Sequence, residues 1–147
     1  MLRKPKTAFA TFDGAAARAY LYERAAKRLT LLPGFPMTGQ KKPEFTDRPT
    51  RVVESLDGRR SGIEPQTDPE KELERRFVAD VARKLDGLKA KKTFDRLIVA
   101  AGPRALGYWR ETAPKELAAS VKREVVSDYA HLDETALLPL VENAFWG

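Results

Sequence analysis

Alternating apolar and polar positions predict three short strands at the start of the chain. Residues 7–12, TAFATF, alternate small or polar side chains with aromatic ones and are followed by the turn residues Asp13 and Gly14. Residues 17–23 also alternate with a period of two, although their alanine content would suit a helix as well. Residues 28–32 form a third β-prone segment. We therefore predict an antiparallel meander of three strands.

The clearest helical pattern begins at Asp68. The Asp68 side chain can cap a helix whose first residue is Pro69, because proline is tolerated at that position. Apolar residues then recur at spacings of three and four positions, which is the spacing of one helix face. The residues of this stripe are Leu73, Phe77, Val81, Leu85 and Leu88. We expect the stripe to pack against the sheet.

The remaining elements alternate between strand and helix. Residues 94–101 are an apolar run of strand length, which is typical of a central strand buried on both faces. Residues 104–111 predict a helix, and residues 114–117 predict a second helical turn. Residues 122–129 are charged and predict an edge strand. A last helix, capped by Asp133, is expected to run towards Phe145.

The predicted order, β-β-β-α-β-α-β-α, indicates an α/β fold with a mixed five-stranded sheet. Three antiparallel strands followed by parallel crossovers are the order of the ribonuclease H-like fold and of the related middle domain of release factors. The 147 residues, 42% of them hydrophobic and 33% charged, are typical of one domain with one core. We therefore treat residues 1–147 as a single domain.

Residues 33–67 are predicted to form a long loop and are the main functional candidate. Loops longer than about 12–15 residues are uncommon in compact domains and are usually functional or disordered. This one carries Arg48, Arg51, Arg59 and Arg60, and guanidinium groups bind phosphates bidentately. Acidic residues nearly balance the same segment, so a solvated loop held by local ion pairs is the alternative. Arg104, at a helix start, is a further candidate for a phosphate contact.

Charge and composition narrow the classes of partner and compartment. The net charge is +6, and residues 1–30 carry seven basic side chains against two acidic ones. A basic face of this kind suits nucleic-acid phosphates or an anionic membrane surface, and it also serves solubility alone. There is no cysteine, signal segment or membrane-length apolar run, so we expect a cytoplasmic protein without disulfides or membrane insertion.

No complete catalytic or metal site is predicted. A two-metal nuclease needs several converging carboxylates, for which Asp13 and Glu72 or Glu74 are candidates. The strand that ends near residues 100–103 supplies no acid, so we interpret Asp13 as a turn residue and the glutamates as helix-dipole partners. His131 is the only histidine, and we expect it to pack or cap rather than act as a base. We therefore expect no catalytic residue, metal or cofactor.

One set of motifs resembles a known family, the host-attachment proteins. The motifs span nearly the whole chain and comprise Thr46-Asp47-Arg48-Pro49, Arg51-Val52, Ser55, Asp57-Gly58-Arg59-Arg60, Ile63-Glu64-Pro65 and Thr67-Asp68-Pro69, then Phe94-Asp95-Arg96-Leu97 and Gly102-Pro103-Arg104 with Leu106-Gly107. The family is named for a requirement in the attachment of bacteria to host cells. It is also similar to the middle domain of archaeal and eukaryotic release factors.

The release-factor resemblance implies a ribosomal role without the release chemistry. In release factors the loop before the first helix carries a Gly-Gly-Gln tip, whereas residues 58–66 here contain Gly62 and Gln66 but no such tripeptide. Pro65 also stiffens the backbone beside Gln66. We therefore predict a bacterial, non-catalytic binding module that contacts RNA or the ribosome in translation. The alternatives are a protein–protein factor in attachment, and a peptidyl-tRNA or ester hydrolase that uses the loop.

Overall fold

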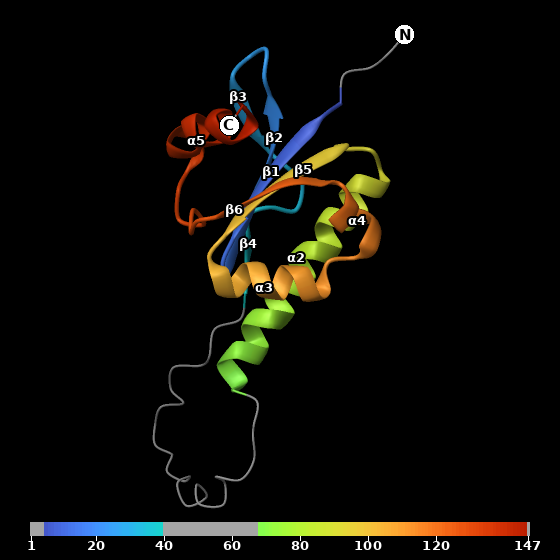
Figure 1. Ribbon diagram of the computed structural model, residues 1–147, viewed down its shortest axis with the longest axis vertical. Coiled ribbons are helices and arrows are strands. Elements are labelled where there is room, and N and C mark those ends of the chain that lie inside the picture. The colour runs from blue at the N-terminus through green and yellow to red at the C-terminus, as the bar shows by residue number, and fades with distance from the viewer. Residues whose placement is uncertain (1–4, 40–67, 147) are drawn as a thin grey trace, which may run out of the picture.

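A computed structural model describes residues 5–39 and 68–146 of the chain, and these residues form one mixed sheet with helices on both faces. Figure 1 shows α2 and α3 on one face of the sheet and α5 on the other. The strands are β1 (Thr7–Phe12), β2 (Ala16–Glu23), β3 (Arg28–Leu31), β4 (Met37–Thr38), β5 (Arg96–Ala101) and β6 (Val121–Val126). The helices are α2 (Pro69–Ala90), α3 (Pro103–Thr112), α4 (Lys115–Ala119) and α5 (Glu134–Trp146).

The sheet has the strand order expected of a ribonuclease H-like domain. Its main path runs β3-β2-β1-β5-β6, with β1 antiparallel to β2 and parallel to β5, and β5 parallel to β6. The α/β class and the mixed sheet predicted from the sequence are confirmed. The predicted count of five strands is wrong, because β4 adds a sixth strand of two residues that pairs with β2.

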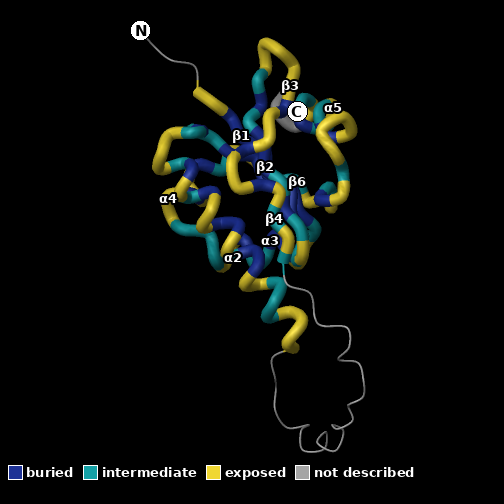
Figure 2. Tube along the Cα trace, turned by 180° about the vertical axis from the view of Figure 1, so that it is seen from behind, coloured by how far each residue is buried: buried dark blue, intermediate teal, exposed yellow. Residues whose placement is uncertain are grey.

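The core consists of two apolar layers separated by the sheet. Alternate residues of β1 and β2 point to opposite faces, so Ala10 and Ala19 join the layer under α2 and α3, whereas Phe9 and Tyr20 join the layer under α5. All of β1 is buried, and β5 is buried from Leu97 onwards, as the dark central strands in Figure 2 show. The prediction of a central strand buried on both faces is confirmed.

Helix α2 follows its sequence signals closely. The Asp68 carboxylate caps it by accepting a hydrogen bond from the Glu70 backbone N–H at 2.9 Å. Four residues of the predicted stripe are buried, but Leu73 is only half-buried because the first turns of α2 extend past the sheet. Trp109 of α3 is also a core residue, as its ring centroid lies 5.5 Å from that of Phe12.

Several boundaries differ from those expected from the sequence. Strand β5 begins at Arg96 rather than at residue 94, and the edge strand β6 ends at Val126 rather than at residue 129. The helical turn predicted from Pro114 is the short helix α4. The short strand considered at residues 51–55 lies outside the described residues. Among the helices that the structure describes, none combines the length and apolar character needed to cross a bilayer.

Candidate functional site

A cleft of about 250 Å³ lies where the parallel strands β1, β5 and β6 end. In open α/β sheets, ligands bind outside the carboxyl ends of the strands, since the connections that follow parallel strands converge there. The β1–β2 turn, the start of α3, the first turns of α2 and the segment after β6 all contribute to it. The polar residues that line it are Asp13, Glu74, Arg104, Tyr108 and Asp128.

The β1–β2 turn forms one wall of the cleft and packs directly on α2. The Asp13 carboxylate accepts hydrogen bonds from the backbone N–H groups of Ala15 and Ala16, both at 2.8 Å. This is the turn role expected of Asp13. A Cβ atom at Gly14 would lie 2.5 Å from Cγ of Glu74, so only glycine allows so close an approach.

An ion pair between α3 and α2 spans the cleft. Nη1 of Arg104 donates to Oε1 of Glu74 at 3.0 Å, with 58% and 27% of the two side chains exposed. An ion pair this exposed contributes little to stability. A guanidinium group has five N–H donors, and this bond uses one of them. Arg104 therefore remains accessible to an anion that enters the cleft.

Tyr108 and Asp128 complete the cleft. Burial raises the pKa of the Tyr108 phenol, and the negative charge of Glu74 raises it further. Tyr108 therefore presents a protonated hydroxyl at neutral pH. The Asp128 carboxylate accepts a hydrogen bond from the Ala130 backbone N–H at 3.4 Å.

The carboxylates of the cleft already have structural partners. Asp13 holds a turn, Glu74 pairs with Arg104, and Asp128 accepts from a backbone amide. Within residues 5–39 and 68–146, no three acidic, histidine or cysteine side chains gather in a group suited to a metal ion. The only histidine, His131, was expected to pack or cap, and it is exposed. Arg104 is therefore the one cationic side chain among the described residues that line the cleft, beside three carboxylates.

Both described ends of the long central segment lie beside this cleft. The backbone N–H of Gly39 donates to the Ala15 carbonyl at 2.7 Å, which places Gly39 against the β1–β2 turn. At the other end, the Asp68 carboxylate is close enough to Tyr108 to contribute to its raised pKa. Figure 1 shows both attachment points at the same end of the molecule as α3. Gly39 and Asp68, the described residues on either side of the segment, therefore contact elements that line the cleft.

Only two of the site residues predicted from the sequence lie within the described part of the chain. Arg104 and Asp68 are described, the first in the ion pair with Glu74 and the second as the cap of α2. The other candidates lie outside the described residues: Asp47, Arg48, Pro49, Arg51, Gly58, Arg59, Arg60, Gly62, Glu64, Pro65 and Gln66.

Two residues of the cleft were missed by sequence reasoning. Tyr108 follows Arg104 by four positions, so a helix starting at Pro103 places both on one face. Asp128 follows the end of β6, and parallel strands end at the same edge of a sheet. Both spacings can be read from the sequence. They place Tyr108 and Asp128 at one site only when β6 is known to run parallel to β5.

Comparisons with known proteins give a family and similar solved structures. A family model described as "Protein required for attachment to host cells" matches residues 8–140. No curated protein sequence matches the chain. A crystal structure of Archaeoglobus fulgidus Pelota is similar at 16% sequence identity with a TM-score of 0.48, and the match covers 98% of this chain and 37% of that chain.

Proposed function

Since the chain belongs to the family of proteins required for attachment to host cells, we propose that it acts in the cytoplasm as a non-catalytic module that contacts RNA, including ribosomal RNA. The observation that supports this proposal is the position of the two described residues that border the central segment. Gly39 bonds to the β1–β2 turn, and Asp68 caps α2, so both contact elements that line the cleft with Arg104. The residues between Gly39 and Asp68 include four arginines.

Two side chains of the cleft can donate hydrogen bonds to a phosphate backbone. Arg104 keeps most of its donors available beside Glu74, and Tyr108 is a protonated hydroxyl donor. Arginine in the segment adds further planar donors that match phosphate oxygens. Single-stranded RNA is flexible enough to follow donors that are spread over a segment and a cleft. Positioned phosphate contacts, rather than a reaction, are therefore the proposed activity.

The test is a salt series with matched variants. Wild type is titrated with labelled single-stranded RNA, tRNA and ribosomes from low to physiological salt, beside the quadruple change of Arg48, Arg51, Arg59 and Arg60 to Ala. The plot of log affinity against log salt is expected to flatten by roughly 0.7 for each phosphate contact removed. Arg104→Ala is expected to lower the slope of this plot by the amount that corresponds to one further phosphate contact.

A second quadruple variant distinguishes the effect of losing the loop arginines from the effect of lowering the net charge. Changing Arg83, Lys115, Lys122 and Arg123 to Ala removes the same charge from exposed positions away from the cleft. This control is expected to keep most of the wild-type affinity and slope. Equal losses in both variants, or no binding of wild type to RNA at low salt, would contradict the proposal.

A protein partner is the second candidate, and the description of the family favours it. In that case the same loop arginines would bind an acidic protein surface. A partner cross-linked to wild type would then survive ribonuclease treatment and would be absent with the loop variant. Loss of the partner after ribonuclease treatment would instead support the RNA proposal.

A further inference from the structure

Strand β6 forms one edge of the sheet. In the described part of the chain it pairs with β5 and with no other strand. The register against β5 shifts near Lys122, so the regular part of the strand runs from Arg123 to Val126. An edge strand presents unpaired backbone N–H and C=O groups, to which another chain can add as a further strand.

The hydrogen bonds to β5 show which backbone groups of β6 point outward. Parallel pairing uses the N–H and C=O groups of every second residue of a strand. The Ser127 N–H donates to the Ala101 carbonyl at 3.0 Å, so Val125, two positions earlier, also directs its groups towards β5. Glu124 and Val126 therefore direct their N–H and C=O groups to the outer edge.

The side chains along this edge change from cationic to apolar. Lys122 and Arg123 are exposed, and neither has a hydrogen-bond or ion-pair partner within the described part of the chain. The Glu124 carboxylate is neutralised by Arg110, which donates to it at 2.6 and 3.1 Å. Val126 is 58% exposed, more than any other large apolar side chain that the structure describes. A complementary strand is therefore acidic in one half and apolar in the other.

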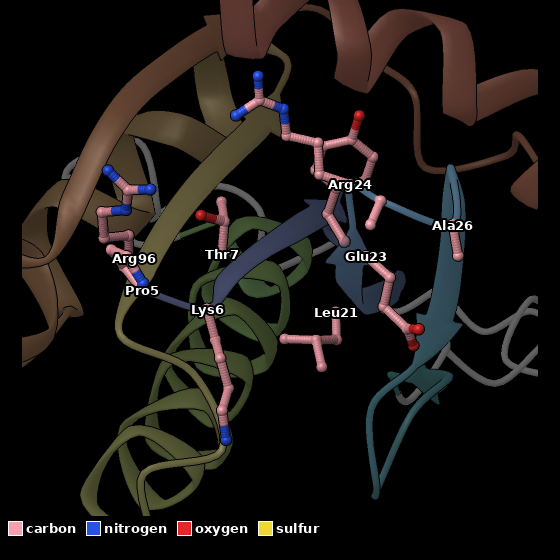
Figure 3. A pocket seen from close by; sticks show the side chains of 10 residues that line it. Pro5, Lys6, Thr7, Leu21, Glu23, Arg24, Ala26 and Arg96 are labelled. Atoms are coloured by element: carbon pink, nitrogen blue, oxygen red, sulfur yellow. The ribbon is translucent and has the colours of Figure 1, made fainter. Parts of the chain in front are cut away.

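Other arginines in or beside the sheet already have partners. Arg24 and Arg96 line a pocket of about 770 Å³ where β1 and β5 begin, shown in Figure 3, and both interact with other groups. On the opposite edge strand, β3, the Arg28 guanidinium bonds Glu23 at 2.7 Å. The unpaired cations of β6 attract an acidic strand, whereas a second copy of β6 would bring the same cations to the edge.

We propose that the β6 edge binds an extended acidic segment of a partner protein, which adds to the sheet as an antiparallel strand. Antiparallel pairing is the more stable arrangement per residue. The backbone groups of Glu124 and Val126 supply the hydrogen bonds of the added strand, and Lys122 and Arg123 select for acidic residues in it. The edge is separate from the cleft, so this interaction is independent of the RNA contact proposed above.

Amide NMR of the full chain during titration with a short synthetic peptide tests this proposal. The peptide has valines in its first half and glutamates in its second half, which matches β6 in the antiparallel direction. Shifts are expected at residues 121–127 and not at residues 28–31 of the β3 edge. Hydrogen exchange of the Glu124 and Val126 amides is expected to slow, whereas the Val125 amide, which already faces β5, is expected to be unchanged.

Two further peptides distinguish strand pairing from charge attraction. One has lysine in place of glutamate, and the other keeps the glutamates but has proline at its central positions, where N–H donors are needed. Both are expected to bind more weakly than the acidic peptide. Equal binding of the proline peptide would show attraction without an added strand and would overturn the proposal.

Charge reversal on β6 gives a result that a folding defect cannot imitate. Lys122→Glu/Arg123→Glu is expected to weaken binding of the acidic peptide about tenfold or more and to strengthen binding of the lysine peptide. Lys71→Glu/Lys91→Glu, at exposed positions near the two ends of α2, is the matched control and is expected to bind both peptides like wild type. The loop variant is also expected to bind like wild type, so failure of the RNA proposal leaves this one standing.

Three other outcomes would overturn the proposal. They are the absence of shifts along β6 with the acidic peptide, equal losses in the β6 and α2 variants, and protection of the Glu124 and Val126 amides without peptide in a dimer detected by sedimentation. The last outcome would assign the edge to a second copy of the chain.

Discussion

At the scale of single residues, the cleft depends on the absence of a side chain. Gly14 brings the β1–β2 turn so close to α2 that a Cβ atom would collide with three side-chain atoms of Glu74. One of those atoms is Cβ of Glu74, which cannot move without the helix backbone. The same contact holds Glu74 beside Arg104. A small residue therefore positions both charged partners.

We predict that Gly14→Ala lowers the free energy of unfolding by about 1–3 kcal/mol, the usual cost of overpacking a close contact. Gly87→Ala on α2 is the control, because a Cβ there would have no neighbour within 4 Å. That change is expected to stabilise the protein by about 0.5–1 kcal/mol, since alanine favours a helix interior. Urea unfolding of both variants measures the difference, and effects of the same sign would refute this account of Gly14.

At the scale of elements, α2 is the longest helix among the described residues and connects the cleft to the core. Its 22 residues begin at Pro69, directly after the cap residue Asp68, and include Leu85 and Leu88 of the core layer. The first two turns lie beyond the buried stripe, so local bonds hold them rather than packing. The geometry of the cleft therefore depends on how well this helix start is capped.

We predict that Asp68→Ala lowers the free energy of unfolding by about 1 kcal/mol, because the Glu70 amide loses its acceptor. Asp68→Asn keeps an acceptor oxygen and is expected to cost much less. Amide hydrogen exchange should increase mainly at the start of α2, with little change at the buried stripe. Equal effects of the alanine and asparagine variants would show that the cap bond is not the cause.

At the scale of the whole molecule, the sheet separates two layers and carries cationic groups at both ends. Arg104 lies at the carboxyl end of the parallel strands, and Arg24 and Arg96 lie at the opposite end. The layer under α5 contains buried tyrosines, including Tyr20. Burial raises the pKa of the Tyr20 phenol, with Arg18 acting in the opposite direction.

The raised pKa of Tyr20 predicts a loss of stability at alkaline pH. The unfolded chain ionises this phenol near its ordinary pKa of about 10, before the folded protein does. The stabilising effect is therefore complete below about pH 10 and is lost as the pH rises further. Tyr20→Phe is expected to reduce the difference between the urea midpoints at neutral and alkaline pH. An unchanged difference would exclude Tyr20 as a source of the alkaline transition.

The elements were readable from the chain because each has a local cause. The Asp68 cap and the stripe through Phe77 and Leu85 mark α2, and the uninterrupted apolar run of residues 97–101 marks the central strand. Hydrophobic periodicity and capping act within a few residues, so no partner element is needed to see them. The two-residue strand β4 was missed because so short a segment has no periodicity of its own.

The cleft was decided by tertiary structure, since it joins residues far apart in the sequence. Glu74 contacts Arg104 because α2 and α3 pack on the same face of the sheet. No sequence motif links these two residues. Thr7 and Arg96 lie side by side only through the parallel register of β1 and β5. The period-two pattern of a strand predicts on which face of the sheet each of its side chains lies. Pairing between strands decides which side chains meet, and that requires the whole sheet to form.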